Sequence, residues 1–260
     1  MSFETFSMSQ NDGITQSEQE ILNVPLGCAT KTQRFWYMDG LLALGMGRFS
    51  FYSFLKDNYG VTMFSYCLLD QINEREDQSD MLFGEQVVSN LTQFTPMIRD
   101  YYSNEHYAVS LSRIQVEGEA LDSYMFPIKM VVDTGSLITD LPSPVYNVLE
   151  RKFLGVANEL AWGRAINISD NYPCYIIDPD QISASSTITF TFQKDAKLIL
   201  RPHNIWRYID EDGAACFAFA DASEASDLKI NILGNIQQQG LRVIIDQTTE
   251  DRIGFDPLGC

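Results

Sequence analysis

The sequence predicts a mainly β protein with a minor share of helix. Short stretches that alternate apolar and polar residues, or that run apolar and β-branched, dominate the chain, and turn residues separate them. Segments with helical periodicity are few. The chain has 260 residues, 45% of them apolar and 12% aromatic, which is enough for one large domain or two small ones. This pattern favours a barrel or a sandwich.

Strands are expected where short apolar runs carry β-branched residues. The clearest stretches are 106–116, 128–132, 187–192, 197–200 and 241–245. Helices are expected over 50–59 and 143–153, and the second begins with Ser143-Pro144, an N-cap residue followed by proline at the first helical position. Residues 71–80 are polar and acidic, which predicts a surface loop or a connection between lobes.

The charge balance is strongly acidic and excludes one class of partner. Lys and Arg number 18 and Asp and Glu number 35, which gives a net charge of −17. We expect no nucleic-acid binding, because a phosphate-binding surface needs clustered Lys and Arg. The excess of acid has two interpretations. One is solubility, and the other is service in an acidic compartment, where protonation of carboxylates relieves their mutual repulsion.

Targeting segments and metal-binding patterns are not apparent in the sequence. No window approaches ~18 uninterrupted apolar residues, so we expect no membrane span. Residues 1–20 are polar, so we expect no signal peptide within the chain. None of the five cysteines forms Cys-x-x-Cys or lies near a His at zinc-ligand spacing, and we expect neither a metal site nor a cofactor. Their wide spread suggests long-range disulfides in a secreted protein.

The strongest chemical motif is a strand that runs into an Asp-Thr-Gly turn. Apolar residues 130–132 lead into Asp133-Thr134-Gly135-Ser136. The strand would hold the carboxylate of Asp133, and Gly135 would let the backbone turn tightly and bring its N–H close to that carboxylate. Ser136 can donate a further hydrogen bond, and the Thr134 hydroxyl can bond to a neighbouring strand. The alternative is an ordinary β-turn that contains Asp and Gly.

A second motif, Ile232-Leu233-Gly234-Asn235-Ile236, gains meaning only from its order in the chain. By itself it is typical of a buried strand end. Together, the two motifs and their surroundings resemble the plant nepenthesin-like branch of the pepsin-type aspartic peptidases. The matching segments are 4–6, 24–28, 39–45, 64–68, 132–142 with Tyr146 and Leu149, 232–239, 243–246 and 252–256.

The resemblance implies a pepsin-like bilobal acid-protease fold, with a complete C-terminal lobe in 81–260 and a partial N-terminal lobe in 1–80. The implied activity is that of an aspartic-type endopeptidase, which hydrolyses protein or peptide substrates with a carboxylate-activated water at acidic pH. Asp133 would be catalytic, and Thr134, Gly135 and Ser136 would support its loop. The implied location is extracellular or vacuolar.

The chain departs from the family pattern at its beginning. The family has two Asp-containing loops and a flap tyrosine, but no second Asp-Thr-Gly or Asp-Ser-Gly precedes Asp133 here, and Met1 aligns just after the flap. We therefore expect a truncated chain that is inactive alone. One alternative is a non-catalytic binding protein, like the xylanase inhibitors of the same branch. A dimer with two facing copies of Asp133 is a third, although residues 1–70 would obstruct it.

The family resemblance also implies a pairing of the cysteines. Cys67 would pair with Cys260, and Cys174 would pair with Cys216. Cys28 would pair with a cysteine in the missing segment, which would explain the odd count.

Overall fold

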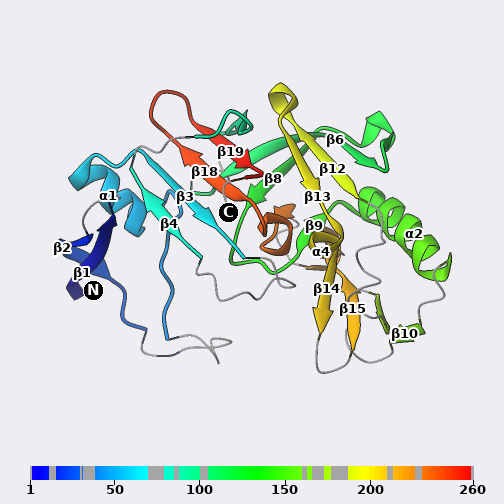
Figure 1. Ribbon diagram of the computed structural model, residues 1–260, viewed down its shortest axis with the longest axis horizontal. Helices are drawn as coiled ribbons and strands as arrows, with labels where there is room; N and C mark the ends of the chain where they lie inside the picture. The colour runs from blue at the N-terminus through cyan, green and yellow to red at the C-terminus, as the bar shows by residue number, and fades with distance from the viewer. Residues whose placement is uncertain are drawn as a thin grey trace. The chain divides into compact units, whose positions relative to one another are not determined.

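The computed structural model is mainly β, as Figure 1 shows. It describes residues 2–11, 16–29, 31, 39–69, 79–84, 88–99, 105–159, 163–165, 173–176, 187–209, 213–225 and 230–258. The chain divides into two compact units, Met1–Val61 and Thr62–Cys260. The predicted lobe boundary at residue 80 stays a prediction.

The first unit contains a hairpin and one helix. Strands β1 (Ser2–Asn11) and β2 (Gln16–Leu26) pair antiparallel, and α1 covers Phe51–Tyr59. The hydroxyl of Ser50 accepts from the N–H of Ser53 (3.0 Å) and caps the helix, while Gly60 ends it in the left-handed region. The helix expected over 50–59 is therefore confirmed.

The second unit is built on three sheets. The largest has the order β13-β12-β6-β8-β17-β9-β16, with β7 beside β6, and the other two have the orders β4-β3-β18-β19-β5 and β10-β11-β15-β14. Strands of the first sheet are β6 (Ala108–Val116), β7 (Glu119–Ala120), β8 (Ile128–Val132), β9 (Thr139–Leu141), β12 (Ile188–Phe192), β13 (Lys197–Leu200), β16 (Phe219–Asp221) and β17 (Ile232–Leu233). Strands of the second are β3 (Met63–Cys67), β4 (Met81–Phe83), β5 (Gln93–Pro96), β18 (Arg242–Asp246) and β19 (Arg252–Asp256). Strands of the third are β10 (Gly163–Ala165), β11 (Cys174–Ile176), β14 (Trp206–Ile209) and β15 (Ala214–Phe217).

Short helices connect and cover these sheets. They are η1 (Ser123–Met125), α2 (Ser143–Glu159), η2 (Gln193–Asp195), α4 (Pro202–Ile205), α5 (Ala222–Ala225) and η4 (Ile236–Gln238). The five strands expected from the sequence are confirmed within two residues at each end. Of the loop expected over 71–80, residues 71–78 lie outside the described part of the chain. None of the helices among the described residues is long and apolar enough to cross a membrane.

Aromatic side chains of α2, β14, β15 and β16 form one part of the core. Phe217 lies 4.9 Å from Phe219 and 5.3 Å from Phe153, ring centre to ring centre, and Trp206 stands edge-on to Phe153. All four side chains are almost completely buried. Burial of this much aromatic surface fixes α2 against the sheets.

The beginning of α2 differs from the expectation in one detail. Ser143 is the first helical residue rather than the N-cap, because the N–H groups of Val145 and Tyr146 already bond to the carbonyl of Pro142. The hydroxyl of Ser143 donates to Asp221 (2.8 Å). The serine therefore ties the helix to the end of β16.

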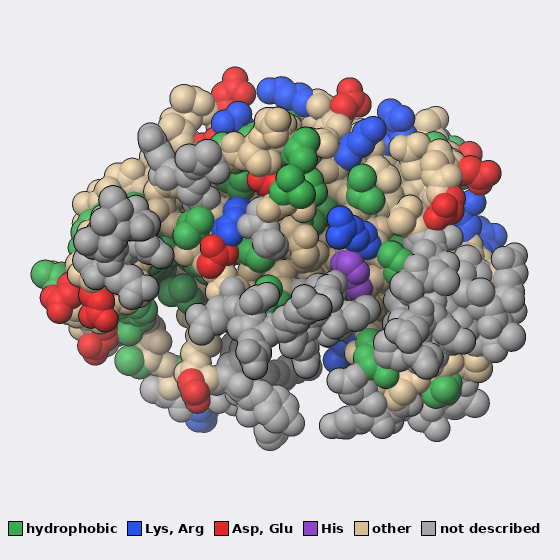
Figure 2. Space-filling model, in the orientation of Figure 1, with side chains coloured by type: hydrophobic (Ala, Val, Ile, Leu, Met, Phe, Trp, Pro, Cys, Tyr) green, Lys and Arg blue, Asp and Glu red, His purple; other side chains and the backbone are tan. Residues whose placement is uncertain are grey.

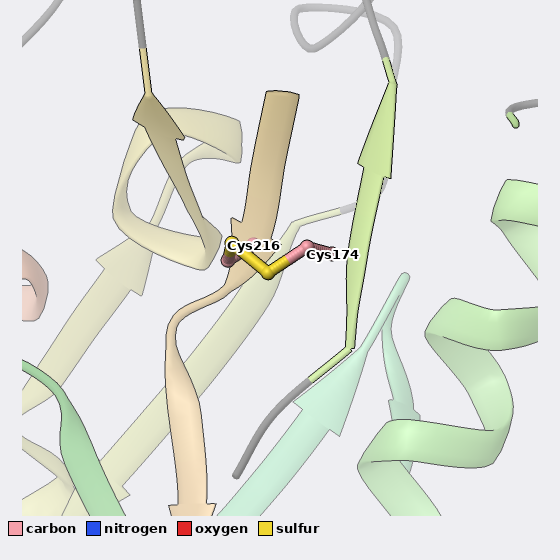
Figure 3. The surroundings of a disulfide bond; sticks show 2 residues. All are labelled: Cys174 and Cys216. Atoms are coloured by element: carbon pink, nitrogen blue, oxygen red, sulfur yellow. A yellow bond between two sulfur atoms is a disulfide. The ribbon is translucent and has the colours of Figure 1, made fainter. Parts of the chain in front are cut away.

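A disulfide joins Cys174 on β11 to Cys216 on β15, the pair that the family resemblance implies (Figure 3). The two residues face each other directly across the strand pair, with their Cα atoms 3.9 Å apart. Cys67 is also disulfide-bonded, but its expected partner Cys260 lies outside the described residues. Cys28 is an exposed free thiol.

Replacing both Cys174 and Cys216 by Ala is expected to lower the free energy of unfolding by about 2–4 kcal/mol, because the bridge closes a long loop in the unfolded chain. The sequence separation is 42 residues. Urea denaturation of the double variant and the parent measures the loss. Cys28→Ala is the control and should change stability by less than about 0.5 kcal/mol. Equal stability of the double variant and the parent would contradict the expectation.

Candidate active site

Asp133 lies immediately after the buried strand β8, at the point where the backbone leaves the central sheet. Its N–H donates to the carbonyl of Leu233 on the neighbouring strand β17 (3.1 Å). Met130, Val131 and Val132 are buried, whereas Asp133 is half-exposed. The run of buried apolar residues thus anchors the strand and leaves the carboxylate that follows it at the boundary with solvent.

Both carboxylate oxygens of Asp133 accept a hydrogen bond from the loop itself. The N–H of Gly135 donates to Oδ1 (2.8 Å), and the hydroxyl of Ser136 donates to Oδ2 (2.9 Å). A Cβ at position 135 would lie 3.1 Å from Oδ1, so glycine permits this close approach. The loop therefore fixes the orientation of the carboxylate through one donor to each oxygen.

The second sequence motif runs alongside this loop. Ile232 and Leu233 of β17 pair in parallel with Val131 and Val132 of β8. Beyond the strands, the N–H of Asn235 donates to the carbonyl of Ser136 (2.7 Å). The side chain of Asn235 donates to the carbonyl of Thr134 (3.2 Å). The bond expected from the hydroxyl of Thr134 stays a prediction. Two segments about a hundred residues apart in sequence thus form one site.

Gly234 stands where the two segments approach most closely. A Cβ at this position would lie 2.2 Å from the carbonyl oxygen of Ile138, a separation that real Cβ atoms essentially never show. The N–H of Gly234 donates to the hydroxyl of Thr139 (3.0 Å). Glycine is therefore required for the two loops to pack backbone against backbone.

Two consecutive glutamines form hydrogen bonds with residues of this site, a role that the sequence did not predict. Gln237 and Gln238 are fully buried. The amide of Gln238 donates to the carbonyls of Leu233 and Gly234, and the amide of Gln237 accepts from the hydroxyl of Thr139 (2.7 Å). The run of three glutamines marked a family resemblance in the sequence, but their hydrogen bonds depend on tertiary contacts.

Tyr66 of β3 is a further residue that sequence reasoning did not single out. Its hydroxyl donates to the side-chain oxygen of Gln238. Burial, and second the negative charge of Asp133, raise the pKa of the Tyr66 phenol well above its usual range. Tyr66 therefore stays neutral and remains a hydrogen-bond donor to Gln238.

A second acidic side chain, Asp140, lies buried on β9, next to Ile232 and Ala220 of the adjacent strands. Burial raises the pKa of Asp140 from 3.8 to about 6. Between these values the folded protein holds a proton that the unfolded chain releases. Asp140 therefore lowers the free energy of unfolding progressively as the pH rises from 3.8 to about 6, and above about pH 6 this loss of stability is complete.

Replacing Asp140 by Asn is expected to raise the free energy of unfolding by about 2 kcal/mol near pH 7, because the buried charge is removed. The gain should shrink as the pH falls and vanish below about pH 3.8, where the aspartate is protonated in both states. Denaturant unfolding of both proteins across this range measures the difference. A gain that does not depend on pH would contradict the assignment.

Among the residues that the structure describes, no group of three or more His, Cys, Asp or Glu side chains is arranged to hold a metal ion.

Comparisons with known proteins agree with this geometry. Residues 106–257 match the family described as Xylanase inhibitor C-terminal, and residues 1–85 match Xylanase inhibitor N-terminal. Aspartyl protease family protein 2 of Arabidopsis thaliana is 29% identical over 95% of this chain and 51% of its own length. Aspartic proteinase nepenthesin-2 of Nepenthes gracilis is 25% identical over 95% of this chain and 56% of its own length. The chain thus spans about half the length of the curated relatives it matches.

Solved structures share the fold at low sequence identity. The crystal structure of Basic 7S globulin from soybean covers 99% of this chain and matches it over 67% of its own length, with a TM-score of 0.76 and 15% identity. Conglutin gamma from lupine seeds matches with a TM-score of 0.73 and 18% identity, over 99% of this chain and 68% of its own. The predicted mainly β, pepsin-like fold is confirmed. The chain belongs to the family of xylanase-inhibitor-type N- and C-terminal domains, whose curated relatives include plant aspartyl proteases.

Proposed function

We propose that this chain supplies one catalytic carboxylate, Asp133, to the active site of an aspartic-type endopeptidase. The observation that carries the proposal is the hydrogen-bonded loop in which Gly135 and Ser136 each donate to one oxygen of Asp133. A decayed site would have no need to keep both donors and the half-exposed carboxylate together. The aspartyl protease names of several relatives give further support.

The proposed chemistry is hydrolysis of a peptide bond by a carboxylate-activated water. Two carboxylates about 3 Å apart share one proton in this mechanism, because like charges at that distance cannot both ionise. The ionised carboxylate takes a proton from water, which attacks the peptide carbonyl, and the protonated one donates to the developing oxyanion. An ionised carboxylate has about four acceptor positions, and the loop donors use two at Asp133, which leaves room for the water and the shared proton.

The second carboxylate of this mechanism has to come from a residue other than Asp133. The sequence contains a single Asp-Thr-Gly, at Asp133, and no Asp-Ser-Gly. We propose that the partner carboxylate comes from a polypeptide segment beyond these 260 residues, and that the 260-residue chain alone does not turn over substrate. The proposed substrates are proteins and peptides, and the proposed location is extracellular or vacuolar, where disulfides persist.

The test is digestion of haemoglobin or casein between about pH 3 and 5, with and without pepstatin. The natural protein, with its length established by intact mass, is compared with the 260-residue chain. A longer natural form should show pepstatin-sensitive turnover, and the 260-residue chain should show none. Turnover that pepstatin does not inhibit in either form would contradict the proposed mechanism.

The matched family descriptions favour a second candidate, a non-catalytic protein that binds a xylan-degrading glycoside hydrolase. Titration of an endo-xylanase with the natural protein distinguishes the two. Inhibition of the xylanase together with no peptidase activity favours the binding protein. Peptidase activity with no effect on the xylanase favours the endopeptidase.

A further inference from the structure

A pocket outside the Asp133 loop opens between β13, α4 and the turn that follows η4. The space within its walls and open mouth is about 620 Å³. The buried side chains of Leu198, Leu241 and Phe255 give it an apolar floor. It is therefore an open concavity with an apolar floor.

The pocket concentrates positive charge on an acidic protein. Lys197 and Arg201 line it, and no Asp or Glu is among the described residues that line it. On the face that Figure 2 shows, a purple histidine side chain lies beside blue side chains of Lys or Arg. Because the whole chain carries a net charge of −17, such a grouping is a local exception that favours an anion.

One buried acceptor in the pocket wall lacks a donor. Gln239 is 8% exposed, and its Oε1 has no hydrogen-bond partner among the described residues. Two hydrogen bonds fix the orientation of the Gln239 amide. Asn235 donates from Nδ2 to the carbonyl of Thr134, so Oδ1 of Asn235 has to be an acceptor. This Oδ1 accepts from Nε2 of Gln239 (2.9 Å). Oε1 of Gln239 therefore remains an acceptor that requires an O–H or N–H from elsewhere.

We propose that this pocket binds a small hydroxylated organic anion, a carboxylate or a phosphate ester. Lys197 and Arg201 would hold its negative group through charge-assisted hydrogen bonds. A hydroxyl of the ligand would donate to Oε1 of Gln239. The site is separate from the proposed peptidase chemistry, and neither proposal depends on the other.

Calorimetric titration of the 260-residue chain at constant ionic strength tests the proposal with two matched pairs of probes. Citrate is compared with tricarballylate, and glycerol 3-phosphate with propyl phosphate, since each pair differs chiefly in hydroxyl groups. Arg201→Gln and Lys197→Gln remove one positive charge each at the exposed rim. Lys152→Gln is the matched control, because it removes an exposed positive charge on α2, where Lys152 pairs with Glu119 (3.4 Å).

We expect one saturable site for citrate or for glycerol 3-phosphate, and the probe that binds identifies the anionic group. Each pocket variant should weaken binding about tenfold, Lys152→Gln should leave it unchanged, and the hydroxyl-free partner should bind several-fold more weakly. Three results would each overturn the proposal: saturable binding by neither hydroxylated probe, equal weakening by Lys152→Gln, or equal affinity for a hydroxylated probe and its hydroxyl-free partner. Thermal unfolding of each variant confirms that the pocket is intact.

Discussion

Asp133→Asn is expected to lower kcat by roughly 10²–10⁴-fold or more in any form of the protein that shows pepstatin-sensitive turnover. An amide cannot take a proton from water, and it cannot share a proton with a second carboxylate. The substitution keeps the size of the side chain. The N–H of Gly135 can still donate to its oxygen, and the hydroxyl of Ser136 can accept from its amide N–H. Steady-state hydrolysis of a quenched peptide measures the loss.

Ser136→Ala is the control for this loop. It removes one donor to Asp133 and leaves the carboxylate in place, so the loss in kcat should be smaller, roughly tenfold. Both variants should unfold at nearly the same denaturant concentration as the parent, because Asp133 is half-exposed. Turnover by Asp133→Asn equal to that of the parent would contradict the proposed role.

Gly234→Ala is expected to lower the free energy of unfolding by about 4 kcal/mol or more. The added Cβ would meet the carbonyl oxygen of Ile138 at 2.2 Å and its Cα at 2.9 Å. Both are backbone atoms, so no side-chain rotation relieves the clash, and the two loops of the site would have to separate. Urea denaturation followed by circular dichroism measures the change.

Gly155→Ala provides the matched control for this substitution. Gly155 lies within α2, and a Cβ there would meet nothing within 4 Å. Alanine is the better helix former, so this variant should be more stable than the parent by roughly 0.5–1 kcal/mol. Unfolding of Gly234→Ala and Gly155→Ala at the same urea concentration would contradict the close backbone packing at Gly234.

The sequence was sufficient for the elements whose signals are local. The strands at β8 and β12 follow from short β-branched runs, and α1 coincides with the helix expected over 50–59. The tight turn at Gly135 and its N–H near the carboxylate also follow from the residues themselves. Each of these features depends on residues a few positions apart.

Features that join distant segments were not predictable from periodicity. The Ile232–Ile236 segment is typical of a strand end by itself, and only its pairing with β8 makes it part of the site. The bond from Tyr66 to Gln238 joins positions 172 residues apart, and no local pattern encodes such a contact. The hydroxyl of Ser143 likewise bonds to a distant aspartate rather than capping its own helix.

The most direct test of the proposed site is a crystal structure of the natural protein with pepstatin bound. We predict a second carboxylate about 3 Å from the carboxylate of Asp133, with a hydroxyl of the inhibitor hydrogen-bonded to both. Bound pepstatin with no carboxylate beside Asp133, or pepstatin seated away from the Asp133 loop, would contradict the account.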